Sequence, residues 1–340
     1  MIVNIYTLIM LFVAIFSLSL GGFLFLLTIR TLLIFKTTVP LEAKTKFEQK
    51  GYLVFLLACV ILSIRMIVWP WFYFMLQSFV SEVPGAMCMF GVTQILPSTV
   101  TFLQIIKPIA FFIMGGWLLC YYVDKSTPTA PLARKNLFFL LIVCGVLLTD
   151  SITDAYYVIR MKPLMAVSCC ATFFDVPLRP SAMIPQAIFG RNFQKSLFII
   201  FYLSNIILII LLFMSSSKRD VLRLKYRRIL LYSQGAIGII NIPVVLYAYI
   251  ENIAPRLMQL PYHHCIYCFM GRGIVPDAPI MLGLFVIGTF AIGWMGILRI
   301  ICRDKETQLL TERLVLKVNN LSAFCFLASL IMVTVHLILV

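Results

Sequence analysis

Charged residues are scarce in this sequence of 340 residues. Asp, Glu, Lys and Arg together make up 12% of the chain, about half of the roughly 25% that soluble globular domains carry. Hydrophobic residues make up 62%, and the mean hydropathy is +1.02. This composition excludes a soluble enzyme. The sequence also lacks Gly-rich phosphate loops, Ser-His-Asp arrangements and acidic pairs of an aqueous cleft, which disfavours nucleotide and hydrolase chemistry.

Long apolar runs take the place of the missing charge. A helix needs about 20 apolar residues to cross the hydrocarbon of a bilayer with all its backbone polar groups paired. The sequence therefore predicts an all-α integral membrane protein, a polytopic bundle of about eight transmembrane helices that forms a single membrane domain over residues 1–340. The predicted spans are 5–29, 53–79, 99–123, 137–159, 196–215, 229–250, 279–300 and 321–340.

Basic residues are distributed unevenly between these spans. Segments 30–52, 124–136, 216–228 and 299–320 hold 5, 3, 6 and 5 Lys or Arg, or 19 of the 28, whereas 80–98, 160–195 and 251–278 hold 0, 5 and 2. Because Lys and Arg remain on the cytoplasmic side, we expect cytoplasmic basic loops and both ends of the chain outside, in a bacterial or archaeal cell membrane. Topology thus explains most of the net charge of +15, which is no sign of a nucleic-acid partner.

A weak tandem repeat of four plus four spans is also expected. The second and third spans form a hairpin that runs in the same direction as the hairpin of the sixth and seventh. Cys88-Met-Phe-Gly91 resembles Cys265-Ile-Tyr-Cys268, and Cys88 and Cys265 are each followed 29 positions later by a tryptophan, Trp117 or Trp294. A parallel repeat of this kind would place a shared site where the halves meet.

Half of the ten cysteines and all three histidines fall on the predicted outer side. The third outward loop reads Leu260-Pro-Tyr-His-His-Cys-Ile-Tyr-Cys-Phe-Met270 and offers four soft or borderline donors within six residues. Such density suits copper, zinc or iron. The predicted metal ligands are His263, His264, Cys265, Cys268, Cys88, Cys169, Cys170 and His336.

The same cysteines allow two other interpretations. Cys265 and Cys268 form a Cys-x-x-Cys dithiol that could exchange with Cys169, Cys170 or Cys88. Cys265-Ile-Tyr-Cys268 resembles, over four residues, the loop dithiols of quinone-coupled disulfide-forming membrane proteins; those have four spans and paired cysteines in two loops, unlike this chain. Structural disulfides are the third interpretation. The Cys-x-x-Cys-His order of covalent c-type haem is absent.

Four charges lie inside predicted spans. Arg65, Lys107, Asp150 and Asp154 are each expensive as isolated ions in hydrocarbon, at roughly 2.5 to 3.5 kcal/mol at the centre of a span. Asp150 and Asp154 share one helix face because they are four residues apart. We expect the two cations to meet the two carboxylates, either as structural ion bridges or as a polar cofactor-binding cluster that lies near a quinone or relays protons.

Three hypotheses follow from these features. The leading one is a membrane protein whose outward Cys/His site binds or handles a transition metal within a transport or electron-transfer assembly. The first alternative is a thiol-disulfide oxidoreductase coupled to quinone, with Cys265, Cys268, Cys169 and Cys170 as its catalytic residues. The second is a non-catalytic subunit with disulfide-stapled outer loops. The expected partners are the lipid bilayer and other membrane or exoplasmic subunits.

Overall fold

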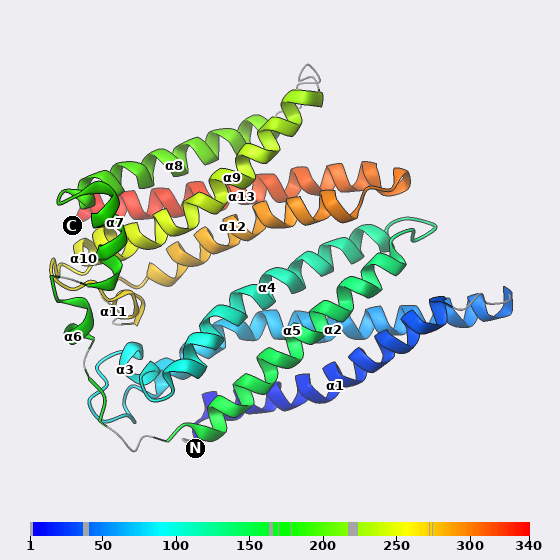
Figure 1. Cartoon of the computed structure of the whole chain (residues 1–340), viewed down its shortest axis with the longest axis horizontal. Coiled ribbons are helices and arrows are strands. Elements are labelled where there is room, and N and C mark those ends of the chain that lie inside the picture. Colours follow the sequence, from blue (N-terminus) through cyan, green and yellow to red (C-terminus); the bar gives the residue numbers. More distant parts are fainter. Residues whose placement is uncertain are drawn as a thin grey trace. The chain divides into compact units, whose positions relative to one another are not determined.

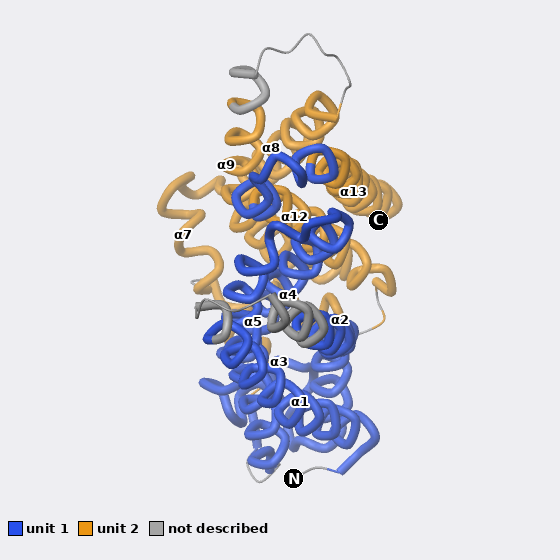
Figure 2. Tube along the Cα trace, turned by 90° about the vertical axis from the view of Figure 1, so that its right-hand side faces the viewer, with its two compact units in different colours: residues 1–167, 297–311 blue, residues 168–296, 312–340 orange. Residues whose placement is uncertain are grey.

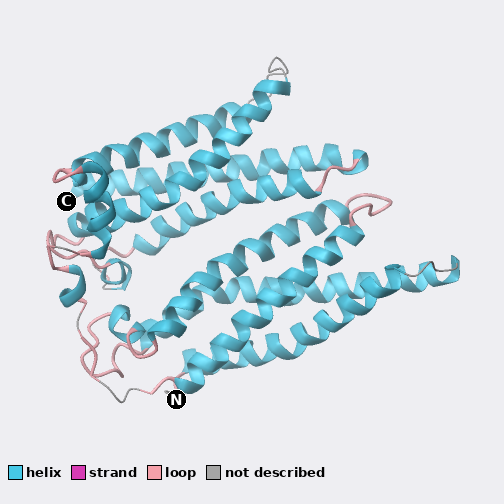
Figure 3. Ribbon diagram, in the orientation of Figure 1, coloured by secondary structure: helices cyan, strands magenta, loops and turns pink. Residues whose placement is uncertain are grey.

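The computed structural model describes residues 3–36, 41–162, 166–168, 170–177, 179–216, 224–271, 273 and 275–340. All regular secondary structure in these ranges is helical (Figure 3). Eight helices are long and apolar enough to cross a membrane, which confirms the predicted fold class. They are α1 (Ile5–Lys36), α2 (Leu41–Ser78), α4 (Pro97–Lys125), α5 (Ala133–Arg160), α8 (Phe193–Ser216), α9 (Leu224–Ala248), α12 (Ala278–Ile301) and α13 (Lys305–Leu339) (Figure 1).

Shorter helices occupy the segments between the long ones. The structure places α3 (Met89–Thr93) between α2 and α4, α6 (Ala171–Phe174) and α7 (Pro180–Phe189) between α5 and α8, and α11 (Ile266–Gly271) before α12. Helix α9 continues into a π-helical turn, η1 (Tyr249–Ile253), and then into α10 (Ala254–Leu257). These short elements all lie in segments that the sequence predicts to face outward.

The chain divides into two compact units (Figure 2). Unit 1 comprises Met1–Val167 and Ile297–Thr311, so it contains α1, α2, α4, α5 and the adjoining ends of α12 and α13. Unit 2 comprises Ser168–Gly296 and Glu312–Val340, and it contains α8, α9 and most of α12 and α13. The division thus separates the first four spans from the fifth and sixth, and it cuts α12 and α13 near the ends that adjoin each other. A tandem duplication of this four-span pattern stays a prediction.

Apolar packing holds unit 1 together. In unit 1, α1 packs against α2 and α5, and α5 packs against α4. Their shared core includes Leu24, Ile61, Trp117 and Leu147, all of which are fully buried. The indole nitrogen of Trp117 donates to the carbonyl oxygen of Asn136 at 3.0 Å, so this large side chain leaves no polar atom unsatisfied.

Many apolar side chains face outward along the spans. Phe12, Ile67 and Ile239 are 69%, 78% and 71% exposed. Exposure on this scale is unfavourable in water, where each such side chain would forfeit about 1.5 to 3 kcal/mol of burial free energy. It is the normal surface of a helix that faces lipid. The exposed residues therefore support the same bilayer environment as the hydropathy of the spans.

Helix α13 is longer than the sequence predicts. The expected span was 321–340, with 299–320 as a loop, but the helix begins at Lys305. Hydropathy detects only the part of a helix that suits hydrocarbon, and the charged residues between 305 and 320 are good helix formers in water. The side chain of Asp304, just before the helix, pairs with Lys135 at 3.0 Å.

Candidate metal centre

Three cysteines of unit 2 come from two separate connecting segments. Cys170 is the residue that precedes α6. Cys265 directly precedes α11, and Cys268 lies within its first turn. A spacing of three places Cys265 and Cys268 on the same face of that helix. The chain reaches this helix through a tight reversal after α10, in which Gln259 has a φ of +56°.

The three sulfurs form one buried group. The Sγ atoms of Cys170, Cys265 and Cys268 all lie within 4.8 Å of one another, and those of Cys170 and Cys268 are 3.5 Å apart. The three residues are 1%, 0% and 0% exposed. Thiolates that bind one tetrahedral Zn²⁺ at about 2.3 Å have their sulfurs about 3.8 Å apart. The observed spacing therefore fits three ligands around a single ion.

The same distances show thiols rather than disulfides. A disulfide requires about 2.05 Å between its sulfurs, well below the 3.5 Å between Cys170 and Cys268. None of the nine cysteines that the structure describes is in a disulfide. The predicted disulfide staples are therefore without support among these residues.

His263 links the sulfur group to a carboxylate. Its Nδ1 lies 2.7 Å from Oδ1 of Asp175, and its Nε2 lies 3.9 Å from Sγ of Cys170. Asp175 follows α6 directly, so one short segment supplies both the cysteine and the carboxylate. Metal-bound histidines usually donate their second ring nitrogen to a carboxylate in this way, which fixes the orientation of the ring. His263 is thus held with Nε2 toward the sulfur of Cys170.

His264 has a different position. Its Nδ1 donates to the carbonyl oxygen of Ile250 at 3.1 Å, and it lies 3.8 Å from Oε2 of Glu251. Burial and the nearby charge of Arg179 lower the pKa of His264, which favours the neutral ring. Its partners are thus the backbone and carboxylate of η1, and it serves to anchor the loop that carries Cys265.

A buried ion pair between Arg179 and Glu251 holds the carboxylate that His264 contacts. The Nε atom of Arg179, just before α7, lies 3.0 Å from both carboxylate oxygens of Glu251, and Nη2 donates to Oε2 as well. Glu251 is 2% exposed and lies in η1. Pro255 follows within the next turn and lacks an N–H to continue the regular helical ladder. Turns of π-helix are frequent at functional sites, and this one carries the Glu251 that contacts Arg179 and His264.

Other predicted ligands lie elsewhere or were not described. His336 is close to the end of α13, where Nδ1 donates to the carbonyl oxygen of Met332 at 2.9 Å and Nε2 lies 3.6 Å from Oδ2 of Asp277. Cys88 belongs to unit 1, where it is the residue before α3, and its role as a ligand stays a prediction. Cys169 lies outside the described residues.

The sequence did not single out Asp175 or Glu251. Neither residue belongs to a recognisable motif. An acidic residue in a connecting loop is ordinarily a solvated surface charge, so its position alone does not indicate a site. The only local signal is the position of Asp175 five residues after Cys170. Their roles depend on contacts between segments that are 72 and 88 residues apart.

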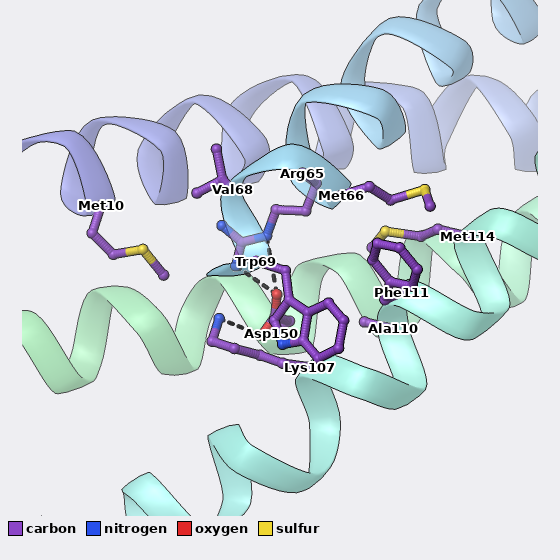
Figure 4. A pocket seen from close by; sticks show the side chains of 10 residues that line it. All are labelled: Met10, Arg65, Met66, Val68, Trp69, Lys107, Ala110, Phe111, Met114 and Asp150. Atoms are coloured by element: carbon purple, nitrogen blue, oxygen red, sulfur yellow. Dashed lines mark hydrogen bonds and ion pairs between the residues drawn. The ribbon is translucent and has the colours of Figure 1, made fainter. Parts of the chain in front are cut away.

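The four predicted intramembrane charges meet in unit 1 (Figure 4 shows three of them). Arg65 donates from Nε and Nη2 to Oδ2 of Asp150 at 3.0 and 2.6 Å, and from Nη2 to Oδ2 of Asp154. Lys107 lies 3.1 Å from the Asp150 carboxylate and 2.8 Å from that of Asp154. Each cation thus contacts both carboxylates. We call Arg65, Lys107, Asp150 and Asp154 the charge tetrad.

Comparison with known proteins gives no further guide. The sequence matches no protein-family model, no curated protein and no solved structure. The functional argument therefore rests on the chemistry of the two sites described above.

Proposed function

We propose that Cys170, Cys265 and Cys268 bind one transition-metal ion at the outer face of the membrane. The observation that carries the proposal is the convergence of three buried sulfurs within 4.8 Å of one another. Buried free thiols without a metal behave as small apolar residues, and chance packing seldom brings three of them to ligand distance. Thiolate ligands favour zinc, iron or copper(I) over hard cations such as magnesium or calcium.

A fourth ligand is expected if the ion is zinc or iron, because both favour tetrahedral sites with sulfur ligands. The sequence offers Cys88 and His263 as candidates. His263 has its Nε2 toward Cys170 and its Nδ1 against Asp175, an arrangement that suits either a ligand or a donor to a bound thiolate. Copper(I) would be satisfied with the three sulfurs alone.

A closed site of this kind favours binding or electron transfer over catalysis at the metal. Catalytic zinc sites keep a coordination position open to water, whereas the three cysteines here are almost fully shielded from solvent. We assign the protein the role of a membrane component whose outer segments carry a bound metal. Iron or copper in the site would make it an electron-transfer component of a membrane assembly, and zinc would make it a structural one.

Metal analysis of the purified full-length protein tests this proposal. We expect about one equivalent of zinc, iron or copper, and we expect Cys268→Ser to lose most of it. Cys325→Ser is the matched control, because Cys325 is also a buried cysteine of unit 2 but lies within α13. A metal-free wild-type protein, or full metal content in Cys268→Ser, would contradict the proposal.

A second pair of variants tests the supporting carboxylate. Asp175→Asn should weaken metal affinity by about 10- to 100-fold, the usual cost of losing a partner of the ligand shell. Asp277→Asn is its control, because Asp277 also faces a histidine, His336, at 3.6 Å. Competition with a chromophoric chelator measures both affinities. Equal metal affinities in the two variants would show that Asp175 does not support the metal site.

The thiol-disulfide oxidoreductase remains the second candidate, on the observation that the Cys170 and Cys268 sulfurs lie 3.5 Å apart. A disulfide would require the two sulfurs to approach from 3.5 Å to about 2.05 Å. Forming that disulfide releases two protons and two electrons, which a membrane quinone would accept. Alkylation before and after reduction distinguishes the candidates: a metal-free protein whose Cys170–Cys268 pair cycles between thiol and disulfide supports this one.

A further inference from the structure

The charge tetrad of unit 1 leaves one strong hydrogen-bond donor unused. Nη1 of Arg65 is buried and has no hydrogen-bond partner among the described residues. The whole residue is only 4% exposed. A buried donor without an acceptor costs about 1 to 3 kcal/mol, and more for a charged group. This nitrogen therefore lacks an acceptor among the residues that the structure describes.

A recess lies beside this donor. It is lined by three members of the tetrad, Arg65, Lys107 and Asp150, together with apolar residues that include Met66, Trp69 and Phe111 (Figure 4). The recess is small, with a cavity volume of about 10 Å³, which is the room of a single oxygen-sized group.

The charges around the recess favour a neutral ligand. Two cations and two carboxylates already balance each other in the tetrad. An added anion or cation would leave one charge uncompensated inside the span, at a cost of several kcal/mol. The ligand therefore needs an acceptor atom without a formal charge, and a carbonyl oxygen meets this requirement.

The mouth of the recess suits a flat ring. Trp69 and Phe111 pack with their ring centroids 4.9 Å apart, and both residues are half-buried. Figure 4 shows Met66 and Met114 beside Phe111 and Met10 across the recess. Methionine side chains adapt their shape readily and contact aromatic rings favourably. A ring could therefore lie against these side chains while its carbonyl oxygen enters the small space beside the tetrad.

The depth of Arg65 excludes a lipid ester as the source of the carbonyl. Arg65 is 14 residues after the start and 13 before the end of the span Gly51–Ser78, or about 20 Å from either end at about 1.5 Å per residue. Phospholipid ester groups lie at the edges of a hydrocarbon layer about 30 Å thick. A carbonyl that reaches mid-span must belong to a molecule that is soluble in the hydrocarbon itself.

We infer that the recess bounded by Arg65, Trp69 and Phe111 binds the carbonyl oxygen of a membrane quinone, with Arg65 Nη1 as the donor. The inference concerns binding alone and is independent of the metal site, which lies in segments of unit 2. Loss of metal binding would leave it intact, and its failure would leave the metal proposal intact.

Photolabelling tests this inference on the full-length protein in quinone-free lipid nanodiscs. The probe is an azido-benzoquinone with a decyl tail, and unlabelled decyl-benzoquinone is the competitor. We expect saturable, competable labelling of peptides from α2 and α4. Labelling that is neither saturable nor competable would overturn the inference, because the recess would then hold no more than a water molecule.

Two variants locate the site. Arg65→Lys keeps the positive charge but removes the guanidinium fork, and it should weaken binding by about 10- to 100-fold, the effect of one hydrogen bond to a charged group. Ala110→Leu fills the recess from α4 without changing a charge, so it serves even if the first variant folds poorly. Ile109→Leu, at the adjacent exposed position, should bind normally. Full affinity in Arg65→Lys or Ala110→Leu would overturn the inference.

Discussion

At the scale of single residues, Asp154 is a buried member of the charge tetrad. Its side chain has no exposed surface, and it contacts both Arg65 and Lys107. Removing one member of a buried ion pair is strongly destabilising because the partner is left as an uncompensated charge. The same pairing on the protein surface contributes little, because water screens both ions.

We therefore expect Asp154→Asn to lower the free energy of unfolding by about 3 to 5 kcal/mol. Asp304→Asn is the control, because Asp304 pairs with Lys135 at 3.0 Å but their side chains are 41% and 51% exposed; its effect should stay below about 1 kcal/mol. Denaturation in mixed detergent micelles measures both. The double variant Asp154→Asn, Lys107→Met restores neutrality and should recover much of the loss. Equal effects of the two single variants would show that the tetrad is not a buried charge cluster.

At the scale of the helices, close contact in unit 2 depends on one glycine of α12. A Cβ atom at Gly288 would lie 3.1 Å from two ring carbons of Phe326 in α13. Ser322 also donates to the carbonyl oxygen of Gly288 at 2.8 Å. Both contacts require the two helix backbones to approach closely, which small residues allow in membrane helices. Gly283, one and a half turns earlier in α12, has open space around it.

Gly288→Ala should consequently destabilise the protein by about 1 to 3 kcal/mol, the usual cost of inserting a methyl group into a packed core. The same substitution at Gly283 meets no atom within 4 Å, and it should be neutral or should stabilise the helix by up to about 1 kcal/mol. Thermal unfolding of the two variants in one detergent provides the comparison. Identical melting temperatures would mean that α12 and α13 do not pack through Gly288.

At the scale of the whole molecule, the eight spans place alternate connecting segments on the same side of the membrane. Segments 30–52, 124–136, 216–228 and 299–320 then share one side and carry 19 of the 28 basic residues. The segments that carry the sulfur group lie on the other. The orientation itself depends on the charge bias, since basic residues near span ends are retained in the cytoplasm.

Reporter fusions test this orientation directly. Alkaline phosphatase inserted after Gln94 or Leu260 should be active, because the enzyme folds only outside the bacterial cytoplasm. A green fluorescent protein inserted after Thr127 or Arg303 should fluoresce, because those positions are predicted to be cytoplasmic. Inactive phosphatase after Gln94 and Leu260, together with no fluorescence after Thr127 and Arg303, would contradict the predicted orientation and would place the metal site in the reducing compartment.

Much of the architecture follows from the sequence alone. Eight helices were predicted because lipid cannot satisfy backbone polar groups, so any apolar run long enough to span must be helical. The meeting of Arg65 and Lys107 with Asp150 and Asp154 was predicted for a related reason, since isolated ions are too costly in hydrocarbon. The Cys-x-x-Cys pair of residues 265 and 268 was recognisable because its spacing is local.

Only the tertiary structure decided what joins these local features. The sequence grouped Cys170 with Cys268 only as members of a larger candidate set. Nothing in it pairs Asp175 with His263 or Arg179 with Glu251, because connecting segments lack the periodicity that reveals a buried face. Nor does it reveal that Arg65 keeps one donor free beside a recess, since that depends on the positions of three other charges. Solvent and lipid act on every residue and so leave a pattern in the sequence, whereas a site is built from a few contacts between segments far apart in the chain.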